Sequence, residues 1–182
     1  CPNSKCAGTQ WGDDGRDAMG VINAAVQAIR DEDPDRPVLI GPPGHNDAEH
    51  LQFVSRDRLP YTFGGSGSFD NDPNMGVAIH FYEPREQPNW AMWVQELKWT
   101  EDSVWQAPIK AQIDYVNAWR TESSHALLPI VTTEWGCWMD EERSKSDDLR
   151  RWLDYTMGLF ATNDVGSMWY VGVMSNKYAF TI

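Results

Sequence analysis

Residues 128–136 read Leu-Pro-Ile-Val-Thr-Thr-Glu-Trp-Gly, an apolar and β-branched run that ends in a carboxylate, an aromatic ring and a glycine. The apolar run predicts a buried strand of a parallel sheet. Desolvation of a charge at the exit of such a strand is unfavourable, so a carboxylate there usually has a function. Active sites of α/β folds also gather at the carboxyl ends of strands. Glu134 is therefore the first candidate residue, although an ordinary solvated glutamate just past a strand has the same pattern.

Helical and strand patterns alternate along the rest of the chain. Apolar residues at helical spacing predict helices over residues 17–30, 46–56, 105–121 and 149–160. Short apolar runs predict strands over residues 38–41, 77–82, 128–134 and 167–173. Residues 60–75 and 85–103 lack periodicity and are expected to form loops. The alternation predicts an α/β fold, with a parallel sheet and flanking helices, in a single domain over residues 1–182.

The composition limits the partners that we expect. The net charge is −12 and Lys and Arg form no cluster, which argues against nucleic acid and anionic membranes. No hydrophobic stretch reaches membrane-spanning length, and no signal peptide is recognisable. Ten of the 182 residues are Trp, whose flat ring suits stacking on sugars as well as core packing. An uncharged polysaccharide is compatible with such an acidic, Trp-rich protein.

The Cys and His residues do not form a ligand pattern. Cys1 and Cys6 can bridge locally, which would leave Cys137 free. His45 and His50 are five residues apart and have no third ligand nearby in the sequence. No Gly-rich phosphate loop follows a predicted strand. We therefore expect no metal and no cofactor, and we interpret a chain that starts at Cys1 rather than Met as a processed or cut product.

Polar and aromatic residues end three of the predicted strands. These residues are His80 and Tyr82, then Glu134, then Trp169, and all should emerge at one edge of a parallel sheet. Each has a structural explanation by itself, as a hydrogen-bonded histidine or a packed ring. Together they provide a carboxylate, two polar neighbours able to orient it and an aromatic platform.

These motifs resemble those of glycoside hydrolase family 5, the cellulase or endo-β-1,4-glucanase group. Residues 80–84, His-Phe-Tyr-Glu-Pro, are similar to the family's His-x-Tyr strand end, and residues 133–136, Thr-Glu-Trp-Gly, to its nucleophile motif. Trp169 follows about 35 residues later, as the family's sugar-stacking Trp does. The first predicted helix together with residues 36–41 fits the family's segment between its fourth and fifth strands. The resemblance implies the C-terminal half, strands five to eight, of a (β/α)8 TIM barrel.

The resemblance also implies an activity and a place for it. It implies retaining hydrolysis of β-1,4-glycosidic bonds in cellulose or related β-glucans or cello-oligosaccharides, by a secreted enzyme. Glu134 would be the nucleophile, Tyr82 would orient it, and His80 would bond the same carboxylate or sugar hydroxyls.

Trp residues are the candidates for sugar binding under this resemblance. Trp169 would carry a ring at the subsite where cleavage begins. Trp90, Trp93 and Trp138 are candidates for an extended binding surface, with core packing as the alternative for each.

The family's acid/base residue has no counterpart in the sequence. A retaining glycosidase needs a second carboxyl group about 5–5.5 Å from the first. The family supplies it from an Asn-Glu dipeptide, which is absent here and would fall just before Cys1. The family's early strands, with their Arg and His site residues, are absent as well. Glu83 is the nearest substitute proton donor in the chain.

Half of a barrel leaves two strand edges and an apolar interior uncovered. Three arrangements would resolve this: the chain is part of a larger protein, two copies pair as a homodimer, or Trp-rich loops cover an open sheet. Two other functions also stay open. One is a non-catalytic carbohydrate-binding half-barrel that uses its Trp platforms, and the other is a structural or interaction domain whose Trp residues all lie in the core.

Overall fold

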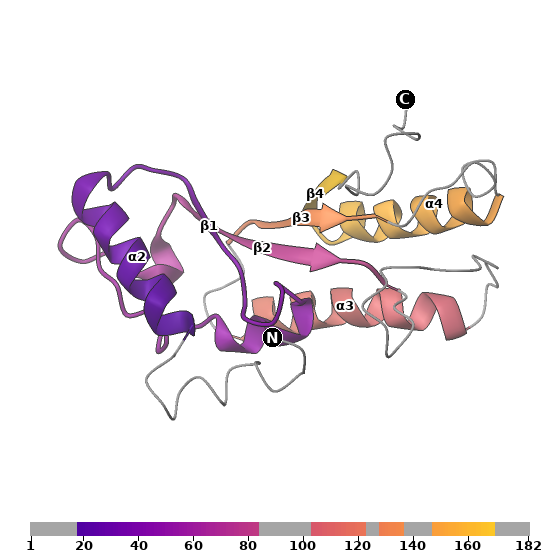
Figure 1. Cartoon of the computed structure of the whole chain (residues 1–182), viewed down its shortest axis with the longest axis horizontal. Helices are drawn as coiled ribbons and strands as arrows, with labels where there is room; N and C mark the ends of the chain where they lie inside the picture. The colour runs from indigo at the N-terminus through magenta and orange to yellow at the C-terminus, as the bar shows by residue number, and fades with distance from the viewer. Residues whose placement is uncertain (1–17, 84–102, 123–127, 137–146, 170–182) are drawn as a thin grey trace.

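Helices and strands alternate along the protein. A computed structural model describes residues 18–83, 103–122, 128–136 and 147–169 (Figure 1). The helices in these residues are α2 (Ala18–Glu32), α3 (Ser103–Thr121) and α4 (Asp147–Thr162), with two 3-10 helices, η2 (Ala48–Phe53) and η3 (Phe69–Asn71). The strands are β1 (Val38–Ile40), β2 (Met75–Phe81), β3 (Ile130–Trp135) and β4 (Val165–Trp169). Each element predicted within these residues is found with boundaries shifted by a few positions, except that the helix predicted over residues 46–56 is only the short 3-10 helix η2.

The strands form one parallel sheet in chain order, β1-β2-β3-β4. Ile40 lies opposite Val77, Val77 opposite Ile130, and Ile130 opposite Val165. Because the strands run in one direction, their carboxyl ends meet at the same side of the sheet, which is called the carboxyl edge below. The predicted α/β fold with a parallel sheet is confirmed.

One face of the sheet packs into the core. Its residues Val77, Ile79, Ile130 and Thr132 are between 0% and 1% exposed. The apolar stripes of the helices join the same cluster, through Met19 and Val26 of α2, Ile109, Ile113 and Val116 of α3, and Leu149, Trp152 and Phe160 of α4. Neighbouring members of each stripe are three or four residues or about two helical turns apart, so one side of each helix is buried.

The opposite face of the sheet is less covered and is called the open face below. It carries Leu39, Ala78, Val131, Gly166 and Met168, as strand register and side-chain alternation require. Leu39 in β1 and Met168 in β4 are each 50% exposed. The core of the described part of the chain therefore lies on the helix side of the sheet.

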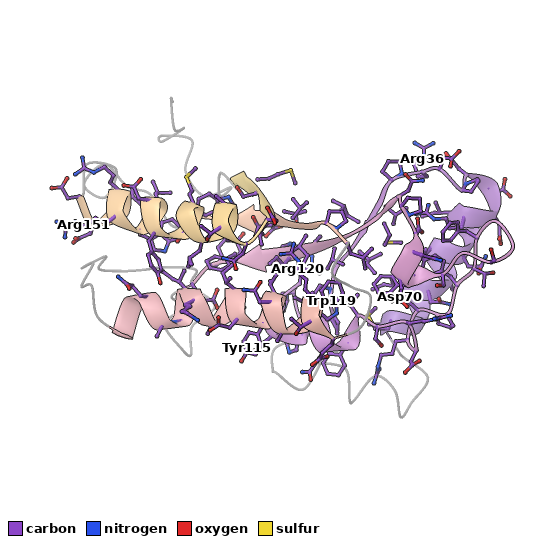
Figure 2. The ribbon with its side chains drawn as sticks, turned by 180° about the vertical axis from the view of Figure 1, so that it is seen from behind. Arg36, Asp70, Tyr115, Trp119, Arg120 and Arg151 are labelled. Carbon is purple, nitrogen blue, oxygen red and sulfur yellow. The ribbon has the colours of Figure 1, made fainter. Side chains whose placement is uncertain are left out.

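The C-terminal half of α3 is fastened to two other segments. The indole nitrogen of Trp119 donates a hydrogen bond of 2.7 Å to the carbonyl oxygen of Val54, just after η2. The Arg120 guanidinium donates to the carbonyl oxygens of Asn163 and Asp164, which follow α4 (Figure 2). Within the described ranges, no helix is long and apolar enough to cross a membrane.

A buried ion pair connects α2 to the segment before β2. Arg30 Nε lies 2.7 Å from Asp72 Oδ2, and both side chains are fully buried. The Tyr61 hydroxyl donates to the same oxygen at 2.9 Å. Burial, together with this bond to Asp72, raises the pKa of Tyr61 above its ordinary range. Residues 60–75, predicted only as a loop, thus form a packed segment that the buried Arg30–Asp72 pair connects to α2.

Candidate active site

Glu134, His80 and Tyr82 meet at the carboxyl edge of the sheet. His80 is in β2 and its Cα partner in β3 is Glu134. Tyr82 immediately follows β2, and its hydroxyl donates a hydrogen bond of 2.8 Å to Glu134 Oε2. His80 Nδ1 lies 3.5 Å from the same oxygen. The structure therefore brings together these three residues, which the sequence placed at the ends of two different strands.

An extra residue in β3 turns Glu134 toward the open face. Ile79 pairs with Thr132, but His80 pairs with Glu134, so Thr133 is an insertion in the ladder. Such a bulge redirects the side chains that follow it. Since Thr132 faces the core, strict alternation would have sent Glu134 to the core as well. With the bulge, Glu134 shares the face of His80.

The Glu134 carboxylate is partly exposed and asymmetrically bonded. Its side chain is 35% exposed and that of His80 is 19% exposed. Both close contacts go to Oε2. Within the described residues, no donor is recorded for Oε1.

Asn46 is a further site residue that the sequence interpretation missed. It lies in the turn after β1, and its carbonyl oxygen accepts a hydrogen bond of 2.9 Å from the backbone nitrogen of His80. Its side-chain Nδ2 is 3.2 Å from His80 Nε2. A lone Asn in a Gly- and Pro-rich turn has no periodic signal. The signal that the sequence offered is that Asn tolerates the left-handed backbone conformation. Asn46 adopts this conformation, with φ at 62°.

Aromatic side chains of the core support the site from the helix side. Trp135 is 3% exposed. Its ring centroid lies 5.7 Å from that of Trp152 and 5.2 Å from that of Phe160, both in α4. The residue next to the candidate carboxylate is thus a core residue that fixes the end of β3 on α4.

Glu83 is buried beside the site. It is 7% exposed, and its Oε2 accepts a hydrogen bond of 3.1 Å from the Tyr82 backbone nitrogen. Its carbonyl oxygen accepts a bond of 3.0 Å from the Trp152 indole. Its role as a substitute acid stays a prediction.

Most of the predicted sugar platforms lie outside the described residues. This applies to Trp90, Trp93 and Trp138. Trp169 ends β4, where its backbone pairs with Trp135, but its side chain is outside the description. The sugar-binding roles of these residues stay predictions.

One group near the site has the composition of a cation site. Ligand atoms of Asp47, Glu49 and His50 lie within 4.8 Å of one another. However, a Cβ on Gly44 would lie 2.5 Å from His50 Nδ1, so this nitrogen packs against the Gly44 backbone. His50 Nε2 faces Glu49 at 3.6 Å. We assign no metal to the group.

A parallel sheet of βα units with polar side chains at its carboxyl edge has the arrangement in which TIM-barrel enzymes place their active sites. The family model for cellulase (glycosyl hydrolase family 5) matches residues 2–174. This chain belongs to glycosyl hydrolase family 5. A search of the curated proteins finds no match.

Solved structures agree with this assignment at the level of the fold. One similar structure is a xyloglucan-specific endo-β-1,4-glucanase of the family, from a metagenomic library and in complex with cellotriose. It is 22% identical to this chain, and the match covers 85% of this chain and 42% of that one at a TM-score of 0.53. The clostridial cellulose synthase subunit Z from Clostridioides difficile is 18% identical, with 84% covering 47% at a TM-score of 0.57. An endoglucanase is 20% identical, with 84% covering 45% at a TM-score of 0.57. The chain therefore spans less than half the length of these structures.

Proposed function

We propose that this chain forms the C-terminal half of a retaining glycoside hydrolase that cleaves β-1,4-glycosidic bonds in cellulose or a related β-glucan, with Glu134 as the nucleophile. The observation that carries the proposal is the contact of Tyr82 Oη with Glu134 Oε2 at 2.8 Å, with His80 beside it, at the carboxyl edge. Membership of the family supports the substrate class. We also propose secretion, because polymeric β-glucans are too large to enter a cell.

Glu134 acts through its less bonded oxygen. In this mechanism Oε1 attacks the anomeric carbon, the bond to the leaving sugar oxygen breaks, and a covalent glycosyl-enzyme forms. Water then attacks the same carbon and releases Glu134. The partial exposure of the carboxylate supports this role, since a substrate can reach it.

Tyr82 and His80 keep the nucleophile charged and directed. A hydroxyl that donates to a carboxylate stabilises its ionised form. Because both contacts lie on Oε2, they hold the carboxylate plane and leave Oε1 directed away from them. Trp169 is proposed to stack on a sugar ring beside the reacting carbon, and Trp90, Trp93 and Trp138 to extend that surface.

We propose that the proton donor comes from a polypeptide segment that is not among the 182 residues of this sequence. A retaining mechanism requires a carboxyl group about 5–5.5 Å from the nucleophile. The sequence contains no Asn-Glu dipeptide, and the chain spans less than half the length of the similar structures. A second copy of this chain would supply another Glu134 but not the family's acid.

A carbohydrate-binding protein without catalysis is the second candidate function. The absence of the Asn-Glu motif favours it, because stacking and hydrogen bonding to sugars do not need a proton donor. Under this proposal the Glu134 carboxylate accepts a hydrogen bond from a sugar hydroxyl and does not attack the anomeric carbon.

The test compares the chain with its Glu134→Gln variant. Reducing-sugar release from carboxymethyl cellulose and mixed-linkage β-glucan reports catalysis, and quenching of Trp fluorescence by cello-oligosaccharides reports binding. Glu134→Gln retains the shape of the side chain and removes the nucleophile. We expect sugar binding by both forms and release only by the wild type when the acid is present.

The outcomes separate the candidates. Binding by both forms with no release, even after addition of the complementary half of a family member, supports the binding function and contradicts the enzyme. Equal release by both forms removes Glu134 from the nucleophile role. If neither form alters its fluorescence or releases sugar, the chain is a structural domain.

A further inference from the structure

We propose that Asn46 is a positioning residue that fixes the proton of His80 on Nδ1, so that this proton faces Glu134. The proposal deepens the proposed function, because it concerns the same carboxylate. It is carried by the geometry of the turn after β1. Neither the sequence pattern nor the resemblance assigns a role to this residue.

Asn46 holds His80 at two points. The His80 backbone nitrogen donates to the Asn46 carbonyl oxygen at 2.9 Å, which fixes the strand at the ring. Asp47 and His80 form a parallel bridge, so the chain rejoins the edge of β2 after the turn. The Asn46 side-chain nitrogen then reaches the ring at 3.2 Å from Nε2. Backbone and side chain together leave the imidazole little freedom to rotate.

The identity of the contacting atoms selects one tautomer. An amide nitrogen carries hydrogens only, so Nε2 must present its lone pair to Asn46. A neutral imidazole has one ring proton, which is then on Nδ1. Nδ1 is the atom that lies 3.5 Å from Glu134 Oε2. In the other tautomer a lone pair of the ring would face the carboxylate, which is repulsive.

The backbone around Asn46 is shaped to hold the amide in this orientation. Gly44, His45 and Asn46 have φ values of 75°, 65° and 62°, a left-handed run that is unfavourable for the two non-glycine residues. Such conformations persist where surrounding contacts impose them, often at functional sites. A Cβ on Gly41 would lie 2.0 Å from Asn46 Oδ1. The oxygen side of the amide therefore rests on Gly41, and the nitrogen side turns to His80.

The groups around His80 are placed so that a proton on Nδ1 faces the Glu134 carboxylate. Glu134 in β3 and the Tyr82 hydroxyl lie on the Nδ1 side. The Asn46 amide, which is uncharged, lies on the Nε2 side, and Asp47 adjoins through the backbone bridge. An amide at this position orients the ring without adding a second charge beside it. In metal sites and catalytic triads, too, the hydrogen bond of one ring nitrogen sets the tautomer, although the partner there accepts the ring proton.

The test reads the tautomer directly and needs no substrate. Long-range proton–nitrogen correlation spectra of the chain with labelled histidine, at mildly alkaline pH, distinguish a protonated from an unprotonated ring nitrogen. The His80→Gln variant assigns the signals among the four histidines. We expect wild-type His80 to carry its proton on Nδ1.

Two substitutions at Asn46 separate the side chain from the backbone. Asn46→Asp is nearly isosteric but places an acceptor against Nε2, so we expect a proton to appear on Nε2. Asn46→Gly keeps the positive φ and deletes the amide, so we expect a mixture of tautomers that resembles free histidine. Backbone amide spectra show whether each variant remains folded.

The result that overturns the proposal is a wild-type His80 protonated on Nε2, or a ring state that neither substitution changes. These outcomes do not depend on whether Glu134 cleaves sugars. Where cleavage is measurable, we expect Asn46→Gly to lower kcat about tenfold with little change in KM, because the substrate does not have to touch Asn46. A change in KM alone would contradict a positioning role.

Discussion

The Tyr82 hydroxyl is the closest donor to Glu134 among the described residues, and its removal gives a direct prediction. Tyr82→Phe retains the ring and deletes the bond of 2.8 Å. A hydrogen bond to a charged group contributes roughly 1.5–3 kcal/mol, so we expect β-glucan cleavage to fall about 10- to 100-fold. The measurement is reducing-sugar release beside wild type and Glu134→Gln. An unchanged rate, with an unchanged unfolding midpoint, would show that the hydroxyl does not assist the nucleophile.

Single residues also show where prediction from the sequence succeeded and where it failed. His80, Tyr82 and Glu134 were predictable because parallel strands bring their carboxyl ends to one edge. The bulge at Thr133 was not, because it is defined by pairing with β2 and β4, which are distant in the sequence. Asn46 was missed for the same reason: its proposed role depends on contact with His80, and the sequence shows only a turn.

Among the elements, the segment between η2 and β2 gives a prediction about stability. Asp72→Asn would leave the buried Arg30 charge without its carboxylate. Breaking a buried ion pair by removing one partner costs about 3–5 kcal/mol. We expect that decrease in the free energy of unfolding, measured by chemical denaturation.

Asp114→Asn in α3 is the matched control. The Lys110–Asp114 pair is as short, at 2.6 Å, but both side chains are 58% exposed. Exposed pairs at this spacing contribute about 0.3–0.5 kcal/mol. If the two variants lowered the free energy of unfolding by similar amounts, burial would not determine how strongly these ion pairs stabilise the protein.

Tyr61 adds a pH dependence to the same network. Burial and the bond to Asp72 raise the pKa of Tyr61, so the folded protein keeps a proton that the unfolded chain releases above the ordinary value of 10.0. The stabilisation that comes from this difference in pKa is fully present below pH 10.0 and is lost as the pH rises above it. We expect Tyr61→Phe to lower stability at neutral pH by about 1 kcal/mol and to weaken the alkaline loss. Parallel stability curves for the two proteins from neutral to strongly alkaline pH would contradict this.

The packing of residues 60–75 also marks a limit of sequence interpretation at the level of elements. The helices and strands were predictable because their apolar residues recur at regular spacing. Tyr61 and Phe69 are buried without such spacing, in a segment held by Arg30 and Asp72. A buried segment with irregular backbone depends on side-chain partners from distant residues, which periodicity does not report.

For the whole molecule, the open face predicts how the isolated chain behaves. Leu39 and Met168 are each 50% exposed on a sheet whose other face is closed by helices, and the chain spans less than half the length of similar structures. Exposed apolar sheet faces and unpaired strand edges promote association. We expect the 20.7 kDa chain to sediment as a dimer or larger species in a concentration-dependent way.

The substitution Leu39→Lys tests whether that association uses the open face. A charge on the open face, on the edge strand β1, must be desolvated when a second sheet covers it, so we expect a shift toward the monomer. Val21→Lys is the control, because Val21 is 68% exposed on α2 and lies outside the sheet. Equal effects of the two substitutions would assign the association to general surface charge. If Leu39→Lys alone yields monomer, the association uses the open face, which either a second copy of the chain or the complementary barrel strands would cover. The complementary strands are the partner if their addition restores cleavage that depends on Glu134.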